Sequence, residues 1–218
     1  MDADFWLQRW REGLIGFHQS EINPFLQRHW QKLGLQGGER VFVPLCGKSK
    51  DMLWLRKQGH SVFGIELSEL AVDSFFRENQ LNPSQRHWAG LPCYEADNIA
   101  LCQGDFFHLQ EEHLSSVRAV YDRASLVALP PAMRTEYARH QARILPPGCE
   151  ILLVSLEYPE HQMEGPPFSI SDAEIEALYG QAFEIEHLES CDTLERNPRF
   201  REQGLSELRE SCFRLRRR

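Results

Sequence analysis

The stretch RVFVPLCGKSKD, residues 40–51, constrains the fold of this chain more than any other part of its sequence. Its first half is apolar and β-prone, as is typical of a strand buried in a parallel sheet, and a single glycine, Gly47, follows. A helical pattern begins at Asp51, and a second apolar segment over 61–65 is followed by Glu66. This order predicts a βαβ unit with polar groups at the strand ends. In open α/β sheets, ligands bind at that edge.

The glycine content of this loop indicates a ligand without phosphate. A Walker loop would need glycine at position 42, where this chain has Phe42, and a dinucleotide fingerprint needs three glycines. Glu66 follows Gly47 by 19 residues, close to the spacing at which an acidic residue reaches ribose hydroxyls. S-adenosylmethionine is the commonest adenosine cofactor that carries no phosphate. The alternative is that the motif is merely the first unit of some other doubly wound domain.

Length and composition fit one globular domain in a reducing compartment. A chain of 218 residues is common for a single α/β domain, and its 42% apolar and 26% charged residues are ordinary for a globular protein. The net charge of −8 argues against a nucleic-acid partner, and no apolar run approaches the ~20 residues of a membrane span. The acidic start MDADFW does not indicate a signal peptide. The six cysteines show no zinc-ligand spacing, so we expect a cytoplasmic, reduced and metal-free protein.

Two aromatic-rich helices are predicted before the first strand, over residues 4–12 and about 22–33. Trp6 and Trp10 share one face of the first helix. The helices could cover the sheet, or they could form a lid over the strand ends, where an aromatic face can attract a cationic sulfonium. We expect Trp6 to lie in the core, whereas either role suits Trp10.

The rest of the chain continues the alternation of strands and helices. Helices are predicted at 69–79, 132–145 and 172–180, a hairpin at 94–102, a loop at about 81–91, strands at 117–121 and 151–156, and a late antiparallel pair at 183–188 and 208–215. Gly104 and Asp105 follow the hairpin and precede two phenylalanines. The carboxylate of Asp105 could accept from an adenine amine, or it could cap a turn.

Four segments together resemble the thiopurine S-methyltransferase family, namely VFVPLCGKSKDMLWL, GHSVFGIELSEL, DRASLVALPP and EGPPFSISDAEIEALYG. The pattern of Trp6, Trp10 and Phe17-His18-Gln19 is similar as well, and the likeness runs from about residue 5 to the end. Chain length and the short N-terminus look like the bacterial branch. The resemblance implies a class I methyltransferase fold, a doubly wound, mostly parallel, Rossmann-like α/β sheet of seven strands with a C-terminal antiparallel strand. We expect one domain over 1–218, with a helical lid (1–35) and a core (40–218).

The resemblance also implies S-adenosyl-L-methionine as methyl donor and S-adenosyl-L-homocysteine as product. The implied cofactor positions are Trp10 as a lid, Leu45 at the methionine end, Glu66 on the ribose, Gly104 and Asp105 at the adenine, and Arg123 near the transferred methyl group. The implied acceptor positions are Phe17, Arg123 and Arg196. Arg123 would position the acceptor; its alternative role is a salt bridge with Asp122 or Glu66.

The implied reaction transfers a methyl group to the sulfur of a thiopurine or aromatic thiol, and bacterial relatives are associated with selenium and tellurium detoxification. We expect no dedicated general base, because a thiolate is already a good nucleophile and none of the nine histidines stands in a catalytic pattern. The alternatives are a small-anion (halide or thiocyanate) methyltransferase and a catalytically silent adenosine-sensing domain. We expect a monomer that acts on a small-molecule thiol, without nucleic acid, membrane or metal.

Overall fold

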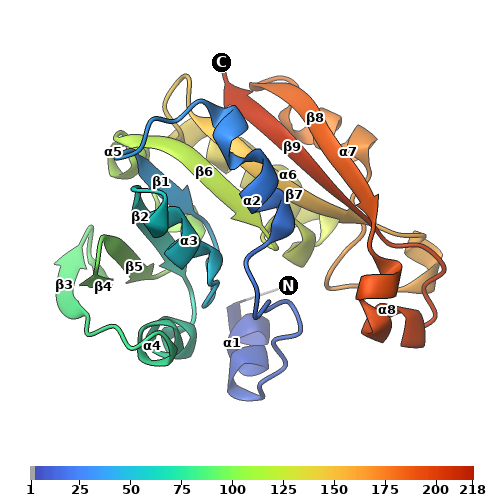
Figure 1. Cartoon of the computed structure of the whole chain (residues 1–218), viewed down its shortest axis with the longest axis horizontal. Helices are drawn as coiled ribbons and strands as arrows, with labels where there is room; N and C mark the ends of the chain where they lie inside the picture. Colours follow the sequence, from blue (N-terminus) through green and yellow to red (C-terminus); the bar gives the residue numbers. More distant parts are fainter. Residues whose placement is uncertain (1–2) are drawn as a thin grey trace.

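The computed structural model describes residues 3–218, which form a central β-sheet with helices packed on both faces (Figure 1). Within these residues the strands are β1 (Arg40–Val43), β2 (Ser61–Glu66), β3 (Ser84–Trp88), β4 (Leu91–Ala96), β5 (Ile99–Gln103), β6 (Val117–Arg123), β7 (Glu150–Glu157), β8 (Phe183–Asp192) and β9 (Arg209–Arg217). The helices are α1 (Ala3–Arg11), α2 (Pro24–His29), α3 (Asp51–Lys57), α4 (Glu69–Glu78), α5 (Glu111–Leu114), α6 (Pro131–Ile144), α7 (Asp172–Tyr179) and α8 (Pro198–Glu202). Short 3-10 turns are η1 (Trp30–Leu33), η2 (Phe106–His108), η3 (Leu126–Ala128), η4 (Glu160–Gln162) and η5 (Leu194–Arg196).

Among the described residues the sheet has nine strands in the order β3-β4-β5-β2-β1-β6-β7-β9-β8. The five strands from β5 to β7 are parallel, and the strands at both edges are antiparallel. The doubly wound, mostly parallel sheet with an antiparallel C-terminal strand is therefore confirmed. The count of seven strands was too low, because β3 and β4 extend the sheet beyond β5.

The prediction of a loop at 81–91 is wrong, because this segment contains the strand β3. Its residues Ser84–Trp88 are almost entirely exposed, so they carry no alternation of apolar and polar side chains that would indicate a strand. The hairpin predicted next to it is confirmed: β4 pairs with β5 around Asp97 and Asn98, both at positive φ. Two such residues suit the tight turns that join twisted strands.

Each central strand packs on helices through both of its faces. On β1, Val41 and Val43 join an apolar cluster with residues of α2, η1, α3 and α4. Phe42 points the other way and joins a cluster with residues of α5, α6 and α7. Burial on both faces explains the unbroken apolar run that indicated this strand in the sequence.

The topology places a ligand crevice beside β1. The chain passes from β1 to β2 on one side and returns to β6 on the other, so the strand order reverses between β1 and β6. In doubly wound sheets, ligands bind outside the carboxyl ends of the strands at such a point. Leu45 follows β1 and Ala124 follows β6, and both have positive φ, a strained conformation for residues other than glycine.

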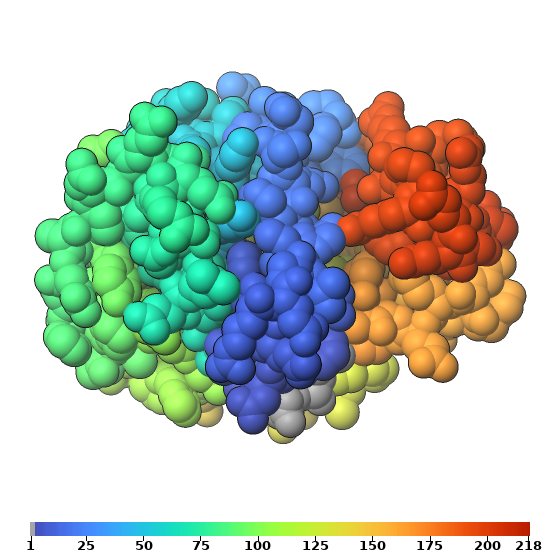
Figure 2. All heavy atoms as spheres, turned by 90° about the horizontal axis from the view of Figure 1, so that it is seen from below, coloured from blue at the N-terminus to red at the C-terminus, as the bar shows by residue number. Residues whose placement is uncertain are grey.

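The N-terminal segment lies across this crevice. Figure 2 shows it running between the part of the chain that contains α4 and the part that contains α8. The helix predicted at 22–33 divides into α2 and η1, and its N-cap is Asn23, whose Oδ1 accepts from the N–H of Phe25 at 2.9 Å. Residues 1 and 2 of the expected lid lie outside the described residues. No helix within 3–218 is long and apolar enough to cross a membrane.

The expectation that all six cysteines are reduced is wrong. Cys93 of β4 and Cys102 of β5 form a disulfide rather than two reduced thiols. They are directly paired across the hairpin, with Cα atoms 4.0 Å apart. This pairing depends on the register of the two strands, which the spacing of the cysteines in the sequence does not determine.

Candidate active site

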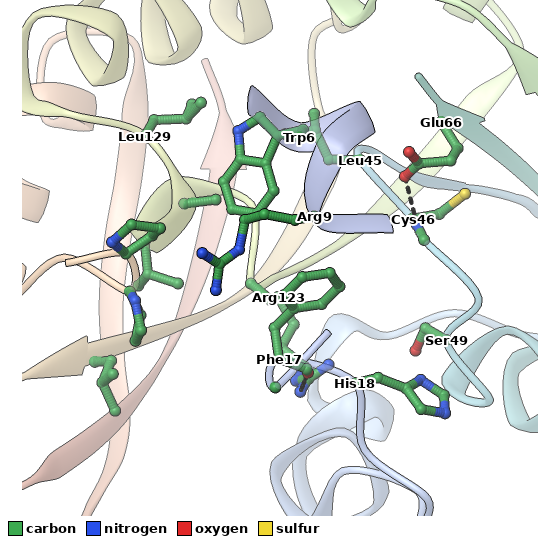
Figure 3. A pocket seen from close by; sticks show the side chains of 18 of the residues that line it. Trp6, Arg9, Phe17, His18, Leu45, Cys46, Ser49, Glu66, Arg123 and Leu129 are labelled. Atoms are coloured by element: carbon green, nitrogen blue, oxygen red, sulfur yellow. Dashed lines mark hydrogen bonds between the residues drawn. The ribbon is translucent and has the colours of Figure 1, made fainter. Parts of the chain in front are cut away.

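A cavity of roughly 470 Å³ lies at the carboxyl edge of the sheet, under the N-terminal segment (Figure 3). Its volume is within the range of small-molecule sites. The predicted site residues that line it are Trp10, Phe17, Leu45, Glu66, Gly104, Asp105 and Arg123. The fold thus brings into one cavity residues that lie more than 100 positions apart in the sequence.

Glu66 ends β2 and supports the loop that follows β1. Its Oε2 accepts the N–H of Gly47 and its Oε1 accepts the N–H of Ser68, both at 2.8 Å. The side chain is 7% exposed, and this burial raises the pKa of the carboxyl group, while the two N–H groups act in the opposite direction. Each carboxylate oxygen can accept more than one hydrogen bond, so Glu66 is able to accept from ligand hydroxyls as well.

The loop after β1 lines the cavity with backbone in an uncommon conformation. Leu45 has a φ of +45° and Gly47 a φ of +51°. Between them, the N–H of Cys46 bonds to the carbonyl of Ile65 at 3.0 Å, so the loop stays attached to β2. Strained residues of this kind persist where the surrounding structure fixes them, often at ligand sites. The peptide groups around Leu45 are therefore candidates for ligand contacts.

The aromatic side chains of the N-terminal segment cover this loop. Trp10 is 7% exposed, and a Cβ on Gly47 would lie 3.3 Å from its indole. The ring of Phe17 lies 5.6 Å from that of Trp10 and 5.9 Å from that of Trp6. The expectation that Trp6 lies in the core is wrong, because Trp6 is only half-buried and lines the cavity. The helical pattern indicated its face, but not that this face meets a cavity rather than the sheet.

Gly104 and Asp105 follow β5 at the far end of the cavity. The N–H of Gly104 bonds to the carbonyl of Glu66 at 2.9 Å, and a Cβ on Gly104 would meet Leu91 at the same distance. Oδ1 of Asp105 accepts from the N–H of Phe107 at 2.9 Å, so the capping role is confirmed. Its carboxylate also lines the cavity, which leaves it able to accept from a ligand.

Arg123 ends β6 and points toward the N-terminal segment. Its Nη2 donates to the backbone carbonyl of Phe17 at 2.9 Å. The alternative salt bridges do not form: Asp122 accepts instead from the hydroxyl of Tyr137 at 2.7 Å, and Glu66 accepts from backbone N–H groups. Asp122 and Arg123 are neighbours in a strand, so their side chains point to opposite faces. Arg123 is thus available to a ligand.

The sequence did not indicate that Arg199 lines the cavity together with Arg123 and Arg9. Arg199 of α8 lines the cavity and donates to the carbonyl of Gly16, whereas Arg196 is not among the cavity residues that the structure describes. Burial and the charge of Arg123 lower the pKa of Arg199. The charges of Arg196 and Arg123 oppose the burial that raises the pKa of Glu210.

The arrangement has two chemically different ends. At one end the carboxylates of Glu66 and Asp105 face the cavity, which suits a nucleoside. At the other end lie Arg123 and Arg199, which can donate paired hydrogen bonds to an anionic or nitrogen-containing acceptor, with Glu210 beside them. Within residues 3–218, no group of three or more His, Cys, Asp or Glu side chains is arranged to hold a metal ion.

Comparisons with known proteins agree along the whole chain. The family model described as thiopurine S-methyltransferase matches residues 1–218. The thiopurine S-methyltransferase of Nitrosospira multiformis is 54% identical over 99% of this chain and 98% of that protein, and a Pseudomonas aeruginosa protein of the same name is 49% identical over 100% of both. Among solved structures, a Burkholderia thailandensis 1,6-didemethyltoxoflavin-N1-methyltransferase with bound S-adenosylhomocysteine has a TM-score of 0.65 at 13% identity, over 99% of this chain and 86% of that chain.

Proposed function

The chain belongs to the thiopurine S-methyltransferase family, and from that premise we propose how its cavity transfers a methyl group. The protein is an S-adenosylmethionine-dependent methyltransferase that acts on the sulfur of thiopurines. One observation carries the mechanism: a single cavity joins the buried carboxylate of Glu66 to the guanidinium of Arg123. Family membership does not favour a small-anion methyltransferase or a silent adenosine-sensing domain.

The Glu66 end of the cavity fits an adenosine without phosphate. Glu66 would hold the ribose hydroxyls, Gly104 and Asp105 the adenine, and the peptide groups around Leu45 the methionine part. Trp10 would cover this end, since an indole face attracts a cation. The single glycine of the loop offers no cradle for a pyrophosphate. When bound, S-adenosylmethionine supplies a methyl group on a positively charged sulfonium. A sulfur nucleophile attacks that methyl carbon in line with its bond to the sulfonium sulfur, and S-adenosylhomocysteine is the leaving group.

The Arg123 end would orient the acceptor. Arg123 and Arg199 would donate to a ring nitrogen or to the thiolate, Phe17 would contact the ring, and Arg196 would lie at the rim. An acceptor that is already ionised needs no general base, so positioning supplies most of the rate. Well-oriented reacting groups can gain about 7–11 kcal/mol. The bond from Arg123 to the carbonyl of Phe17 supports this role, because it fixes both residues at the same wall.

Transfer of a labelled methyl group from S-adenosylmethionine to 6-mercaptopurine tests the proposal. We expect an S-methylated product together with S-adenosylhomocysteine. Methylation of iodide or thiocyanate without any transfer to thiols would favour the small-anion enzyme. Binding of S-adenosylmethionine without transfer to any of these acceptors would favour the sensing domain.

We further propose that soft selenium and tellurium nucleophiles are accepted, since they attack a sulfonium methyl as sulfur does. The protein would act in the cytoplasm as a monomer of one domain with an N-terminal lid, on small molecules rather than nucleic acid. The net charge of −8 supports the last point. A screen of thiol, selenol and tellurite acceptors and a size-exclusion experiment test these proposals.

A further inference from the structure

Glu210 lies at the acceptor end of the cavity, and the mechanism above gives it no role. It is the second residue of β9, is partly exposed and lines the cavity. No hydrogen bond or ion pair engages its carboxylate among the residues that the structure describes. A carboxylate in this state is able to accept a hydrogen bond from a bound molecule.

The register of the sheet places Glu210 on the same face as Arg123. Arg123 is paired with Val154 across β6 and β7, Val154 is paired with Cys212 across β7 and β9, and Glu210 is two residues from Cys212. Paired residues, and residues two apart in one strand, point to the same face. The two Cα atoms are separated by two strand spacings of about 4.8 Å and two residue steps of about 3.4 Å. Their long side chains can therefore approach one small ring from two sides.

The burial of Glu210 favours a carboxylate that can take up a proton, and the charged groups around it oppose this effect. Burial raises its pKa, and the charges of Arg123 of β6 and Arg196 of η5 act in the opposite direction. On the other side, Cys191 of β8 is paired with Glu210. The pKa of the Cys191 thiol is raised, mainly by its hydrogen bond to Glu189 and then by burial. A carboxylate whose pKa is raised toward the working pH is a better proton acceptor than one in water.

We propose that Glu210 is a catalytic residue that accepts the ring N–H proton of acceptors that bind as thiones. This acceptor class is the heterocycles in which a C=S group adjoins a ring N–H. The inference rests on the methyltransferase function proposed above. It assigns to Glu210 a step that Arg123 and Arg199 cannot perform, because arginine remains protonated in proteins and has no acceptor atom.

The step balances in atoms and charge. The thione sulfur attacks the methyl group, the new S–CH3 bond forms, and the bond from the methyl to the sulfonium sulfur breaks with its electron pair left on S-adenosylhomocysteine. The C=S bond becomes C–S, the N–H electron pair becomes the second bond of C=N, and the proton moves to a carboxylate oxygen of Glu210. The sulfonium cation, the Glu210 carboxylate and the neutral thione become neutral S-adenosylhomocysteine, a neutral carboxylic acid and the neutral S-methyl product. The exposed side of Glu210 then returns the proton to water.

The test compares two acceptors in the variant Glu210→Gln. Pyridine-2-thione carries the N–H, whereas pentafluorothiophenol has none and is already a thiolate at neutral pH. Glutamine can still accept a hydrogen bond from the N–H but cannot take its proton, so we expect kcat for the thione to fall about tenfold or more with KM within about twofold. The kinetics of pentafluorothiophenol and the Kd of S-adenosylhomocysteine should stay within about twofold. Glu207→Gln, an exposed glutamate three residues earlier, is the matched control.

An equal loss on both acceptors, or no loss on the thione, overturns the inference but leaves the methyltransferase function intact. Absence of transfer to both acceptors by the unmodified protein would instead contradict that function. A second readout needs no variant: the ratio of kcat for the thione to kcat for pentafluorothiophenol should fall as the pH is lowered and Glu210 becomes protonated. A ratio independent of pH overturns the inference even where Glu210→Gln does not fold.

Discussion

Arg123, at the end of β6, donates a hydrogen bond from Nη2 to the backbone carbonyl of Phe17, which is 2.9 Å away and 106 residues earlier in the chain. The ring of Phe17 packs edge-on against Trp10. The residue that faces the acceptor end therefore also holds the segment that covers the loop after β1. In this arrangement the cover and the acceptor wall form one unit, so changes at either part should affect methyl transfer.

Replacing Arg123 with alanine should reduce kcat/KM for 6-mercaptopurine by roughly tenfold to a hundredfold, as expected for loss of a charged hydrogen bond of about 1.5–3 kcal/mol. The Kd of S-adenosylhomocysteine should change far less, because Glu66 and the loop after β1 remain intact and the bond from Arg199 to the carbonyl of Gly16 still holds the N-terminal segment. Steady-state kinetics and calorimetry measure the two quantities. Arg118→Ala, an exposed residue of the same strand, is the control. An unfolded or cofactor-blind variant would assign Arg123 a structural role instead.

Gly47→Ala should weaken cofactor binding and destabilise the fold. Gly47 has a φ of +51°, which costs an L-residue about 1–2 kcal/mol, and its new Cβ would lie 3.3 Å from the indole of Trp10. Displacement of Trp10 should raise the Kd of S-adenosylhomocysteine, as measured by tryptophan fluorescence. Gly148→Ala has a φ of +77° and nothing within 4 Å of its Cβ, so it controls for backbone strain alone. Equal effects of both variants on Kd would refute the contact between Gly47 and Trp10.

The two arginines near α8 should differ in their effect on the acceptor. Arg199 lines the cavity, so Arg199→Ala should raise the KM for 6-mercaptopurine by about tenfold, the equivalent of a hydrogen bond to a charged group. Arg196→Ala should change the KM by less than about threefold, because Arg196 is not among the described residues that line the cavity and affects Glu210 through its charge. Steady-state kinetics of the two variants show which arginine contacts the acceptor. A larger effect of Arg196→Ala than of Arg199→Ala would mean that Arg196 contacts the acceptor, as the family resemblance implied.

Glu189 should make the free energy of unfolding depend on pH in the acidic range. The thiol of Cys191, then His29 and Arg28, bond to this carboxylate and lower its pKa to about 2 from the usual 4.5. Because the pKa is lowered in the folded state, ionised Glu189 stabilises the protein above about pH 4.5, and this contribution is lost as the pH falls toward about 2. Glu189→Gln should therefore lower the free energy of unfolding at pH 7 by about 1 kcal/mol, a figure reduced for solvent screening of a partly exposed group.

Urea denaturation of Glu189→Gln between pH 7 and pH 3 measures this dependence. The difference from the unmodified protein should shrink steadily below about pH 4.5. Glu184→Gln, an exposed residue of the same strand, should show no such trend. A difference that is constant with pH would mean that packing, not charge, gives Glu189 its effect.

The sequence predicted what depends on local pattern and missed what depends on tertiary placement. β1 and β2 were predictable because burial on both faces demands continuous apolar residues, whereas the exposed edge strand β3 carries no such pattern. Alternation along β6 would have separated Asp122 from Arg123, since neighbouring residues of a strand point to opposite faces.

Two missed cavity residues, Arg199 and Glu210, have a common cause. Arg199 lies in the polar segment 195–202, where Arg196, Arg199 and Arg201 are equivalent by local pattern and only the docking of α8 selects one of them. Glu210 lies on a strand whose face toward the cavity is set by pairing with β7. Spacing along the chain carries no information about either placement.

Calorimetric titration of S-adenosylhomocysteine into the unmodified protein and into Glu66→Gln tests directly whether Glu66 holds the ribose of the cofactor. We expect one-site binding to the unmodified protein. We also expect at least about tenfold weaker binding to Glu66→Gln, whose amide cannot accept from both Gly47 and Ser68 and also hold a ribose. Glu69→Gln, an exposed residue of α4, should bind as the unmodified protein does. No heat with S-adenosylhomocysteine, together with strong binding of a nucleotide such as ATP, would contradict the assignment of this cavity to S-adenosylmethionine.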